Sequence, residues 1–238
     1  MSSLRPILAA LALALSVAGC GSGSDSDEAP ATPAGTQPPG TYSYATTGFE
    51  QIGGPLPGRH RYGPRSTIAV DLTGCELTER WDGTAERWAE WRYCVEGGEW
   101  QLRSVTDHHE FYGRVEEYSY RCSGRRVPRP AQVEEGFRWT DRCRARGTGA
   151  IARGEVVSVG PVKAAGAIVE AVHLRVRTAL SGRVQGAYGL DSWLRRKDGL
   201  LLRRTFDSET RVRSVIGTVP ARERYELSIR ALEPDTGG

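Results

Sequence analysis

The 238-residue sequence predicts a mainly β fold: a curved antiparallel sheet, of the half-barrel or open barrel-like kind, with few short helices. Three observations lead to this fold class. Several segments alternate apolar and polar residues, glycine-containing turn signals separate them, and no segment sustains a helical period of 3.6 residues. One face of the sheet is expected to be apolar and aromatic and the other rich in Arg and Glu, as antiparallel sheets allow.

Period-two alternation indicates strands that are buried on one face only. The segments with this alternation are Thr67–Leu72, Glu117–Arg121, Val172–Arg177 and Arg224–Ala231. Two further segments, Gly154–Val159 and Leu200–Phe206, are rich in β-branched or apolar residues and are also expected to be strands.

Turn signals between apolar runs predict two hairpins, because Gly-Gly and Asp-Gly between strands are strong hairpin cues. The first turn is Glu96–Glu99, between the expected strands Trp91–Val95 and Trp100–Val105. The second is Lys197–Gly199, between the expected strands Trp193–Arg196 and Leu200–Arg204.

Short helices are expected at Phe137–Arg144 and Ala164–Ala171, although neither segment has a long helical period. The sheet must cover its apolar face, and it can do so in three ways: by closing toward a barrel, by packing on a second sheet, or by cupping a ligand.

The N-terminus has the pattern of an export signal. A positive charge at Arg5 precedes an apolar stretch, Ile7–Val17, that is too short to span a bilayer comfortably. Val17-Ala18-Gly19-Cys20 then resembles the lipobox of bacterial prolipoproteins. That resemblance implies a diacylglyceryl group on Cys20 and cleavage just before it. Two acyl chains bind a membrane stably, so no transmembrane helix is required.

Three regions follow from this pattern. Residues 1–19 are expected to be a lipoprotein signal peptide. Residues 20–40 are rich in Gly, Ser, Pro and Thr and are expected to be a lipid-anchored flexible tether. Residues 41–238 are expected to be one disulfide-bonded β domain, exported and held at the outer face of the cell membrane or in the cell envelope.

Four cysteines remain besides Cys20, and an even number in an oxidising compartment indicates disulfides. Three pairings are possible. Cys75–Cys94 and Cys122–Cys143 are favoured. Zinc is disfavoured, because the sequence has no Cys-x-x-Cys and no histidine in a ligand pattern beside the cysteines.

Hairpin geometry supports the first pairing. If Glu76–Asp82 and Arg87–Tyr93 are antiparallel strands joined by a turn at residues 83–86, Cys75 lies opposite Cys94 and Trp81 lies opposite Trp88. A cross-strand aromatic pair and a disulfide in the same register then support one another.

Charge composition argues against a nucleic-acid partner. The chain has 32 basic and 29 acidic residues, and the two signs are interleaved along it. A mixed-charge, solvated surface is therefore expected.

Residues with catalytic potential are sparse. No Gly-x-Ser-x-Gly elbow, phosphate loop, calcium loop or dinucleotide fingerprint is present. Asp107–Glu110 is the segment with the clearest catalytic or metal-binding potential. On a strand, His108 and Glu110 would lie on one face and Asp107 and His109 on the other. Either pair is a candidate acid–base or metal half-site, and a charged strand end or turn is the alternative. His60 is expected in a polar loop and His173 on an exposed strand face.

The tryptophans have two interpretations. Aromatic side chains on an exposed sheet could stack on sugar rings, but aromatic side chains that fill a β core are commoner. The six residues are Trp81, Trp88, Trp91, Trp100, Trp139 and Trp193.

Together, the lipobox Val17–Cys20, the tether and the curved sheet resemble half-barrel lipoprotein carriers of the LolA/LppX type, in which a concave apolar face holds acyl chains. The resemblance implies a non-enzymatic lipoprotein that binds an apolar or amphiphilic ligand, or an envelope partner. No cofactor and no metal are expected. Two alternatives stay open: a cell-envelope hydrolase with a dispersed acidic and His site, and a structural or interaction lipoprotein without a small ligand.

Overall fold

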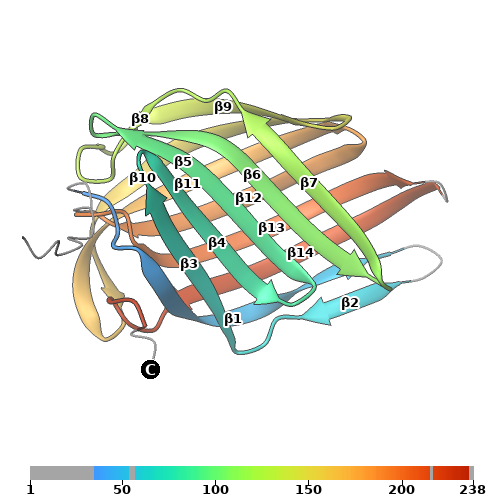
Figure 1. The fold of residues 1–238 in the computed structure, drawn as a ribbon, viewed down its shortest axis with the longest axis horizontal. Coiled ribbons are helices and arrows are strands. Elements are labelled where there is room, and N and C mark those ends of the chain that lie inside the picture. Colours follow the sequence, from blue (N-terminus) through green and yellow to red (C-terminus); the bar gives the residue numbers. More distant parts are fainter. Residues whose placement is uncertain (1–34, 54–56, 215–216, 236–238) are drawn as a thin grey trace, which may run out of the picture. The chain divides into compact units, whose positions relative to one another are not determined.

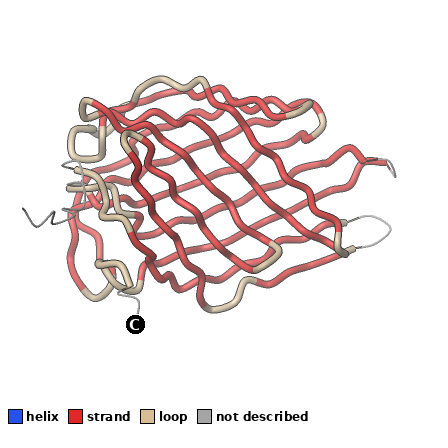
Figure 2. Tube along the Cα trace, in the orientation of Figure 1, coloured by secondary structure: helices blue, strands red, loops and turns tan. Residues whose placement is uncertain are grey.

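The computed structural model describes residues 35–53, 57–214 and 217–235, which form strands, turns and loops but no helix (Figure 2). The predicted signal peptide, Cys20 and most of the tether lie outside the described residues. Within the described residues there is no helix long and apolar enough to cross a membrane. In chain order the strands are β1 (Gly40–Ile52), β2 (Gly58–Arg61), β3 (Arg65–Thr73), β4 (Glu76–Thr84), β5 (Arg87–Glu96), β6 (Glu99–Phe111), β7 (Arg114–Cys122), β8 (Val127–Pro128), β9 (Arg138–Ala145), β10 (Thr148–Ala164), β11 (Ala167–Gly182), β12 (Val184–Arg195), β13 (Leu201–Ser214) and β14 (Gly217–Ile229).

The strands form a closed antiparallel barrel of 12 strands. The first and last strands close it, since β1 pairs with β14 from Tyr44↔Ile229 to Ile52↔Ala221. Figure 1 shows β3 to β7 crossing in front of β10 to β14, the strand tilt that closure of a barrel requires. The prediction of a mainly β fold with a curved antiparallel sheet is therefore confirmed. The sheet is closed into a barrel rather than left open.

The two expected helices are strands instead. Phe137–Arg144 falls mostly in β9, whose backbone pairs with β10 from Thr148↔Ala145 to Glu155↔Arg138. Ala164–Ala171 crosses the β10–β11 hairpin, where Ala165 and Gly166 have φ values of 47° and 79°. Pairing with neighbouring strands satisfies these backbones, and it outweighs a weak local preference.

The β4–β5 hairpin forms as predicted, but its register differs by one residue. Glu76 lies opposite Cys94, and Trp81 lies opposite Ala89 rather than Trp88. A register irregularity between Asp82 and Thr84 accompanies the shift. A one-residue slip moves side chains to the other face. Trp81 is therefore fully buried inside, whereas Trp88 stacks on His108.

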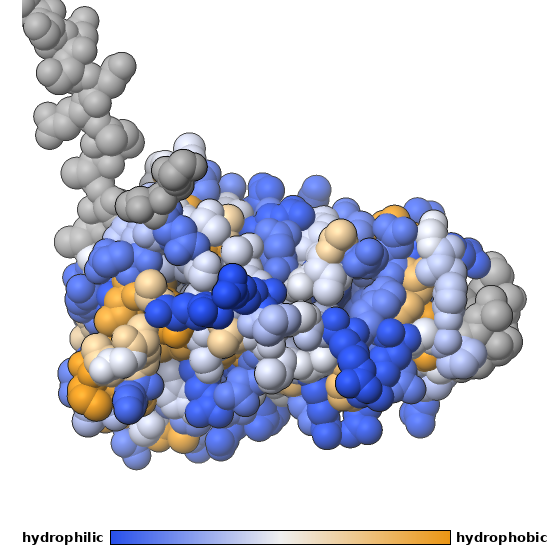
Figure 3. Space-filling view, turned by 90° about the horizontal axis from the view of Figure 1, so that it is seen from below, coloured by the Kyte–Doolittle hydropathy of each residue, from blue (hydrophilic) through white to orange (hydrophobic). Residues whose placement is uncertain are grey.

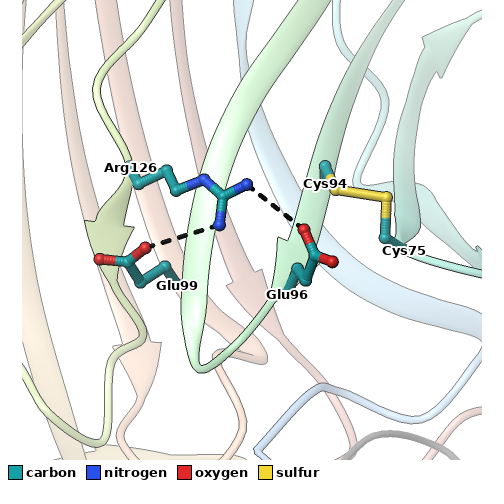
Figure 4. The surroundings of a disulfide bond; sticks show 5 residues. All are labelled: Cys75, Cys94, Glu96, Glu99 and Arg126. Carbon is teal, nitrogen blue, oxygen red and sulfur yellow. Dashed lines mark hydrogen bonds and ion pairs between the residues drawn. A yellow bond between two sulfur atoms is a disulfide. The ribbon is translucent and has the colours of Figure 1, made fainter.

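Both predicted disulfides are present. Cys75, in the turn before β4, is bonded to Cys94 of β5, close to the ion pairs that Arg126 makes with Glu96 and Glu99 (Figure 4). Cys122–Cys143 joins β7 to β9. These two strands pair only at Arg121↔Arg144 and Cys122↔Cys143, so the second disulfide lies at the narrowest joint of the barrel.

One end of the barrel is filled by a packed core. Its members come from the ends of β1, β3, β4, β13 and β14 that meet there, and include Tyr42, Tyr44, Ile68, Val70, Leu77, Leu200, Leu201, Leu202, Leu227 and Ile229. The outer surface is mostly hydrophilic on the face that Figure 3 shows, with apolar residues gathered toward one end. Inward side chains beyond the packed core surround the lumen.

Candidate functional site

The barrel lumen holds a cavity of about 530 Å³, within the range of about 300–1,000 Å³ that small-molecule sites occupy. Its walls are largely apolar and aromatic. The inward side chains of this kind include Trp91, Tyr93, Leu102, Tyr120, Leu174, Val176, Leu190 and Phe206. Most of the tryptophans thus face inward, as the core interpretation expects, and three of them both pack against core residues and line the cavity: Trp91, Trp100 and Trp139.

The open end of the lumen lies where strands end opposite the packed core. Apolar residues near these ends line the cavity, and they are Ile52, Leu180, Val184, Val212 and Val219. An ion pair lies at the same end between β7 and the bend just before β12, with 3.3 Å between Arg183 Nη2 and a carboxylate oxygen of Glu116. An amphiphile would therefore meet an apolar opening bordered by charge.

A buried charge cluster occupies one wall of the lumen. Arg87, at 2% exposed, donates from Nε to Glu223 Oε1 at 3.0 Å and from Nη2 to Glu223 Oε2 at 3.2 Å. The same Nε lies 3.8 Å from Glu50 Oε2, and Nη2 also donates to Asp107 at 3.3 Å. Burial alone would lower the pKa of Arg87, but Glu223 and Asp107 raise it, so the guanidinium stays charged. Tyr62 donates to Glu223 at 2.6 Å.

Two histidines bind the second carboxylate of this cluster. His60 Nδ1 lies 3.0 Å from Glu50 Oε1, and His109 Nδ1 lies 2.7 Å from Glu50 Oε2. His60 is in β2 rather than in a loop, and it stacks on Phe111 with ring centroids 4.3 Å apart. β2 pairs with the end of β1 that carries Glu50, and this pairing brings His60 to the site.

The strand faces predicted for the Asp107–Glu110 run are confirmed. Asp107 and His109 line the lumen, whereas His108 stacks on Trp88 at 4.9 Å outside it. His173 differs from the expectation of an exposed side chain. It is half-buried, stacks on Trp193 at 4.2 Å and contacts Asp191 at 2.9 Å.

The geometry of Glu50, His109 and Glu223 resembles a metal site, since one ligand atom from each lies within 4.8 Å of the others. The donor set does not fit a metal well. Both carboxylates already face the guanidinium of Arg87, and Glu223 Oε1 accepts from Tyr62 and Arg87 together. Arg87 is thus the internal cation of this cluster, and a divalent ion would face a positive charge.

A second buried cation lies deeper in the lumen. Arg204 is 4% exposed and lines the cavity. Its Nε donates to Ser192 Oγ at 3.3 Å, and its guanidinium lies 4.6 Å from the centroid of Trp91. Its Nη1 has no hydrogen-bond partner, and no carboxylate of the described residues lies within 4.0 Å of it. We call this region, with Ser192 and Trp91, the lumen floor.

Glu79 lies in the same deep part of the lumen and accepts a 2.6 Å hydrogen bond from Gln37. Burial raises the pKa of Glu79, and Arg204 and Gln37 only partly oppose the rise. Glu79 and Arg204 therefore interact electrostatically, but no ion pair within 4.0 Å joins them in the described chain.

The charge cluster predicts a loss of stability in acid. Burial alone would raise the pKa of Glu50, but His109, Arg87 and His60 together lower it below the usual 4.5. A carboxylate with a lowered folded-state pKa stabilises the fold above its unfolded pKa, and this contribution is lost as pH falls through the folded value. Urea unfolding between pH 7 and pH 3 should show the wild type losing more stability than Glu50→Gln. Equal losses would contradict the assignment.

Sequence reasoning missed Glu50, Arg87, Arg204 and Glu223. A usable signal was present for two of them. Arg204 shares a strand face with Leu202 and Phe206, and Glu223 extends the face of Tyr225. A charged residue on the apolar face of a strand indicates a buried polar site. The period-two pattern of the sequence shows directly which charged residues lie on that face.

Nucleophilic catalysis finds little support in this geometry. Within the described chain, the four histidines contact carboxylates at Glu50, Glu117 and Asp191, not a Ser hydroxyl or a Cys thiol. The described cysteines are in disulfides. Comparisons with protein-family models, with curated proteins and with solved structures found no match to this chain.

Proposed function

We propose that this protein binds a small apolar or amphiphilic molecule inside its barrel. The observation that carries the proposal is the lumen: a closed barrel whose interior is only partly filled by the packed core and whose remaining volume of about 530 Å³ has mainly apolar and aromatic walls. An apolar cavity of this size with a few polar groups is the usual form of a small-molecule site.

Export and lipid anchoring belong to the same proposal. The lipobox-like Val17–Cys20 would tether the barrel to a membrane, and the two disulfides are consistent with an oxidising compartment. A barrel held at a membrane surface would be well placed to take up an amphiphile from it.

The hydrolase alternative requires acids and histidines gathered in a cleft, and the lumen does gather Glu50, Asp107 and His109. Binding is the better supported function, because Arg87 and the histidines already engage these carboxylates. Each of these carboxylates would have to break its contact with a buried partner before it could act on a substrate.

Binding in the lumen can be tested with Nile red, a neutral dye that fluoresces in apolar surroundings. The protein would be the full chain with Cys20→Ser, so that no acyl chain of its own competes for the cavity. Ala152 lines the lumen, and the adjacent Ile151 points outward. We expect bright, saturable binding that Ala152→Trp lowers at least about tenfold, because an added indole displaces ligand from a site of limited volume.

Ile151→Trp is the matched control and should bind the dye like the parent chain. Circular dichroism of both variants would verify that the barrel forms. An absence of dye binding by the parent chain, or equal binding by the two Trp variants, would refute a ligand site in the lumen.

A further inference from the structure

Arg204 is a buried cation of the lumen that forms no ion pair in the described chain. The three carboxylates of the charge cluster each contact Arg87, and two histidines bind Glu50. Arg204, by contrast, is nine-tenths buried or more, its Nη1 has no hydrogen-bond partner, and it forms no ion pair within 4.0 Å in the described chain.

An uncompensated buried charge costs stability, and it is commonly found where a ligand or catalytic step uses it. The guanidinium is held in place by Ser192 Oγ on β12 and by the ring of Trp91 on β5, so it is positioned from two sides of the barrel. A fixed, planar guanidinium with an unpaired Nη1 donor matches the geometry of a carboxylate.

The position of Arg204 sets the orientation of a ligand. Leu202, two residues earlier on the same face of β13, belongs to the packed core, and Phe206 and Val212, further along β13, line the cavity toward its open end. A molecule that reaches Arg204 therefore has its head at the floor and its body along apolar walls.

We propose that the lumen binds an amphiphile with a single negative charge, a long-chain carboxylate, whose head group pairs with Arg204 at the lumen floor and whose chain extends toward the open end. This inference rests on the proposed function and specifies its ligand class. A monoanion is favoured over a phosphate monoester, because one open guanidinium compensates about one charge. A second negative charge would remain buried without a partner.

The test compares palmitate, hexadecanol and hexadecyl phosphate, each competing with Nile red on the full chain with Cys20→Ser. The three share a sixteen-carbon chain and differ in the head group. Arg204→Gln is the test variant. Arg203→Gln is the control, since Arg203 immediately precedes Arg204 in β13, points outward and pairs with Glu226 at the surface.

We expect palmitate to bind the parent chain most tightly. Arg204→Gln should weaken palmitate by about 10- to 100-fold, which is the effect of losing a hydrogen bond to a charged group in a buried site. Hexadecanol should change little, and Arg203→Gln should leave all three ligands unchanged.

Loss of folding is separated from loss of recognition by thermal unfolding without ligand. If Arg204 serves the ligand, removing its uncompensated charge should leave the melting temperature unchanged or raise it. A lowered melting temperature, with hexadecanol binding lost as well, would make Arg204 structural and overturn the inference.

The remaining outcomes separate the two proposals. Equal binding of palmitate and hexadecanol by both the parent chain and Arg204→Gln would overturn the carboxylate inference and leave lumen binding intact. Tighter binding of hexadecyl phosphate than of palmitate would also overturn it. Failure of all three ligands and of Nile red to bind the parent chain would overturn the proposed function itself.

Discussion

Arg87→Met is expected to destabilise the barrel by about 3–5 kcal/mol, the cost of leaving buried charges without their partner. Glu50 and Glu223 are at most 6% exposed, and both face this guanidinium. Methionine has a similar length and is apolar, so the loss of packing is small. The two carboxylates would instead repel one another across a low-dielectric space.

Urea unfolding at pH 7 measures this effect directly. Arg92→Met is the matched control, because Arg92 is also on β5 but pairs with Glu90 and Glu76 at the surface. Exposed pairs contribute about 0–1 kcal/mol. A loss for Arg87→Met as small as that for Arg92→Met would show that the cluster is solvated and would contradict the described burial.

Removal of the carboxylates supplies a second check on the same variant. Adding Glu50→Gln and Glu223→Gln to Arg87→Met should restore a large part of the lost stability, since no buried charge then remains unpaired. Acid should act in the same direction, because protonated carboxyls no longer repel. The stability gap between the wild type and Arg87→Met is therefore expected to narrow as pH falls below about 4.5.

Loss of the Cys122–Cys143 disulfide is expected to have the second largest effect. Chain entropy alone predicts about 3 kcal/mol for a closed loop of this length. The Cys75–Cys94 disulfide closes a similar loop, with a separation of 19 residues against 21. Chain entropy therefore predicts that removing either disulfide lowers the free energy of unfolding by nearly the same amount. Any difference between the two losses would come from the surroundings of each disulfide.

The surroundings differ sharply. Cys75–Cys94 supports a hairpin that is already paired from Glu76↔Cys94 to Thr84↔Arg87. Cys122–Cys143 lies at a joint with two paired positions, and the stretch of β7 before Arg121 does not pair with β9. We expect Cys122→Ser with Cys143→Ser to lose more stability than Cys75→Ser with Cys94→Ser, and to open the barrel locally.

Local opening has its own measurement. Amide hydrogen exchange should accelerate in β7 and β9 for the Cys122→Ser, Cys143→Ser variant and not in β3 or β4, and Nile red should dissociate faster from it. The Cys75→Ser, Cys94→Ser variant should show neither change. Equal stability losses with unchanged exchange in β7 and β9 would show that backbone pairing alone holds the joint.

Much of the fold was predictable because period-two alternation is local. In a segment such as Arg224–Ala231, the alternation of apolar and polar residues indicates which face is buried. A turn such as Glu96–Glu99 can be predicted from its own residues alone. The Cys75–Cys94 pairing followed from the same hairpin logic. The register of β4 and β5 could not be predicted in this way. An irregularity at Asp82 to Thr84 moves Trp88 outward, and no residue type in the sequence marks that irregularity.

Half of the candidate site was beyond local reasoning. Asp107 and His109 could be assigned to one strand face, but the partner of His109 is Glu50, 59 residues earlier. Arg87 meets Glu223 across 136 residues, because β1 joins β14 and brings the two ends of the chain together. No pattern within a strand records which other strand closes against it.

The sequence by itself determined the fold class, many of the strands and turns, and the favoured cysteine pairs, because each depends mainly on residues that are near one another along the chain. Only the tertiary structure decided that the sheet closes, that the closed barrel keeps an unfilled lumen, and that Arg204 lies in it without an ion-pair partner. Closure and cavity volume depend on how twelve strands tilt and how their inward side chains fill the interior together. Closure and cavity volume are therefore properties of the whole barrel and cannot be assigned to any single segment.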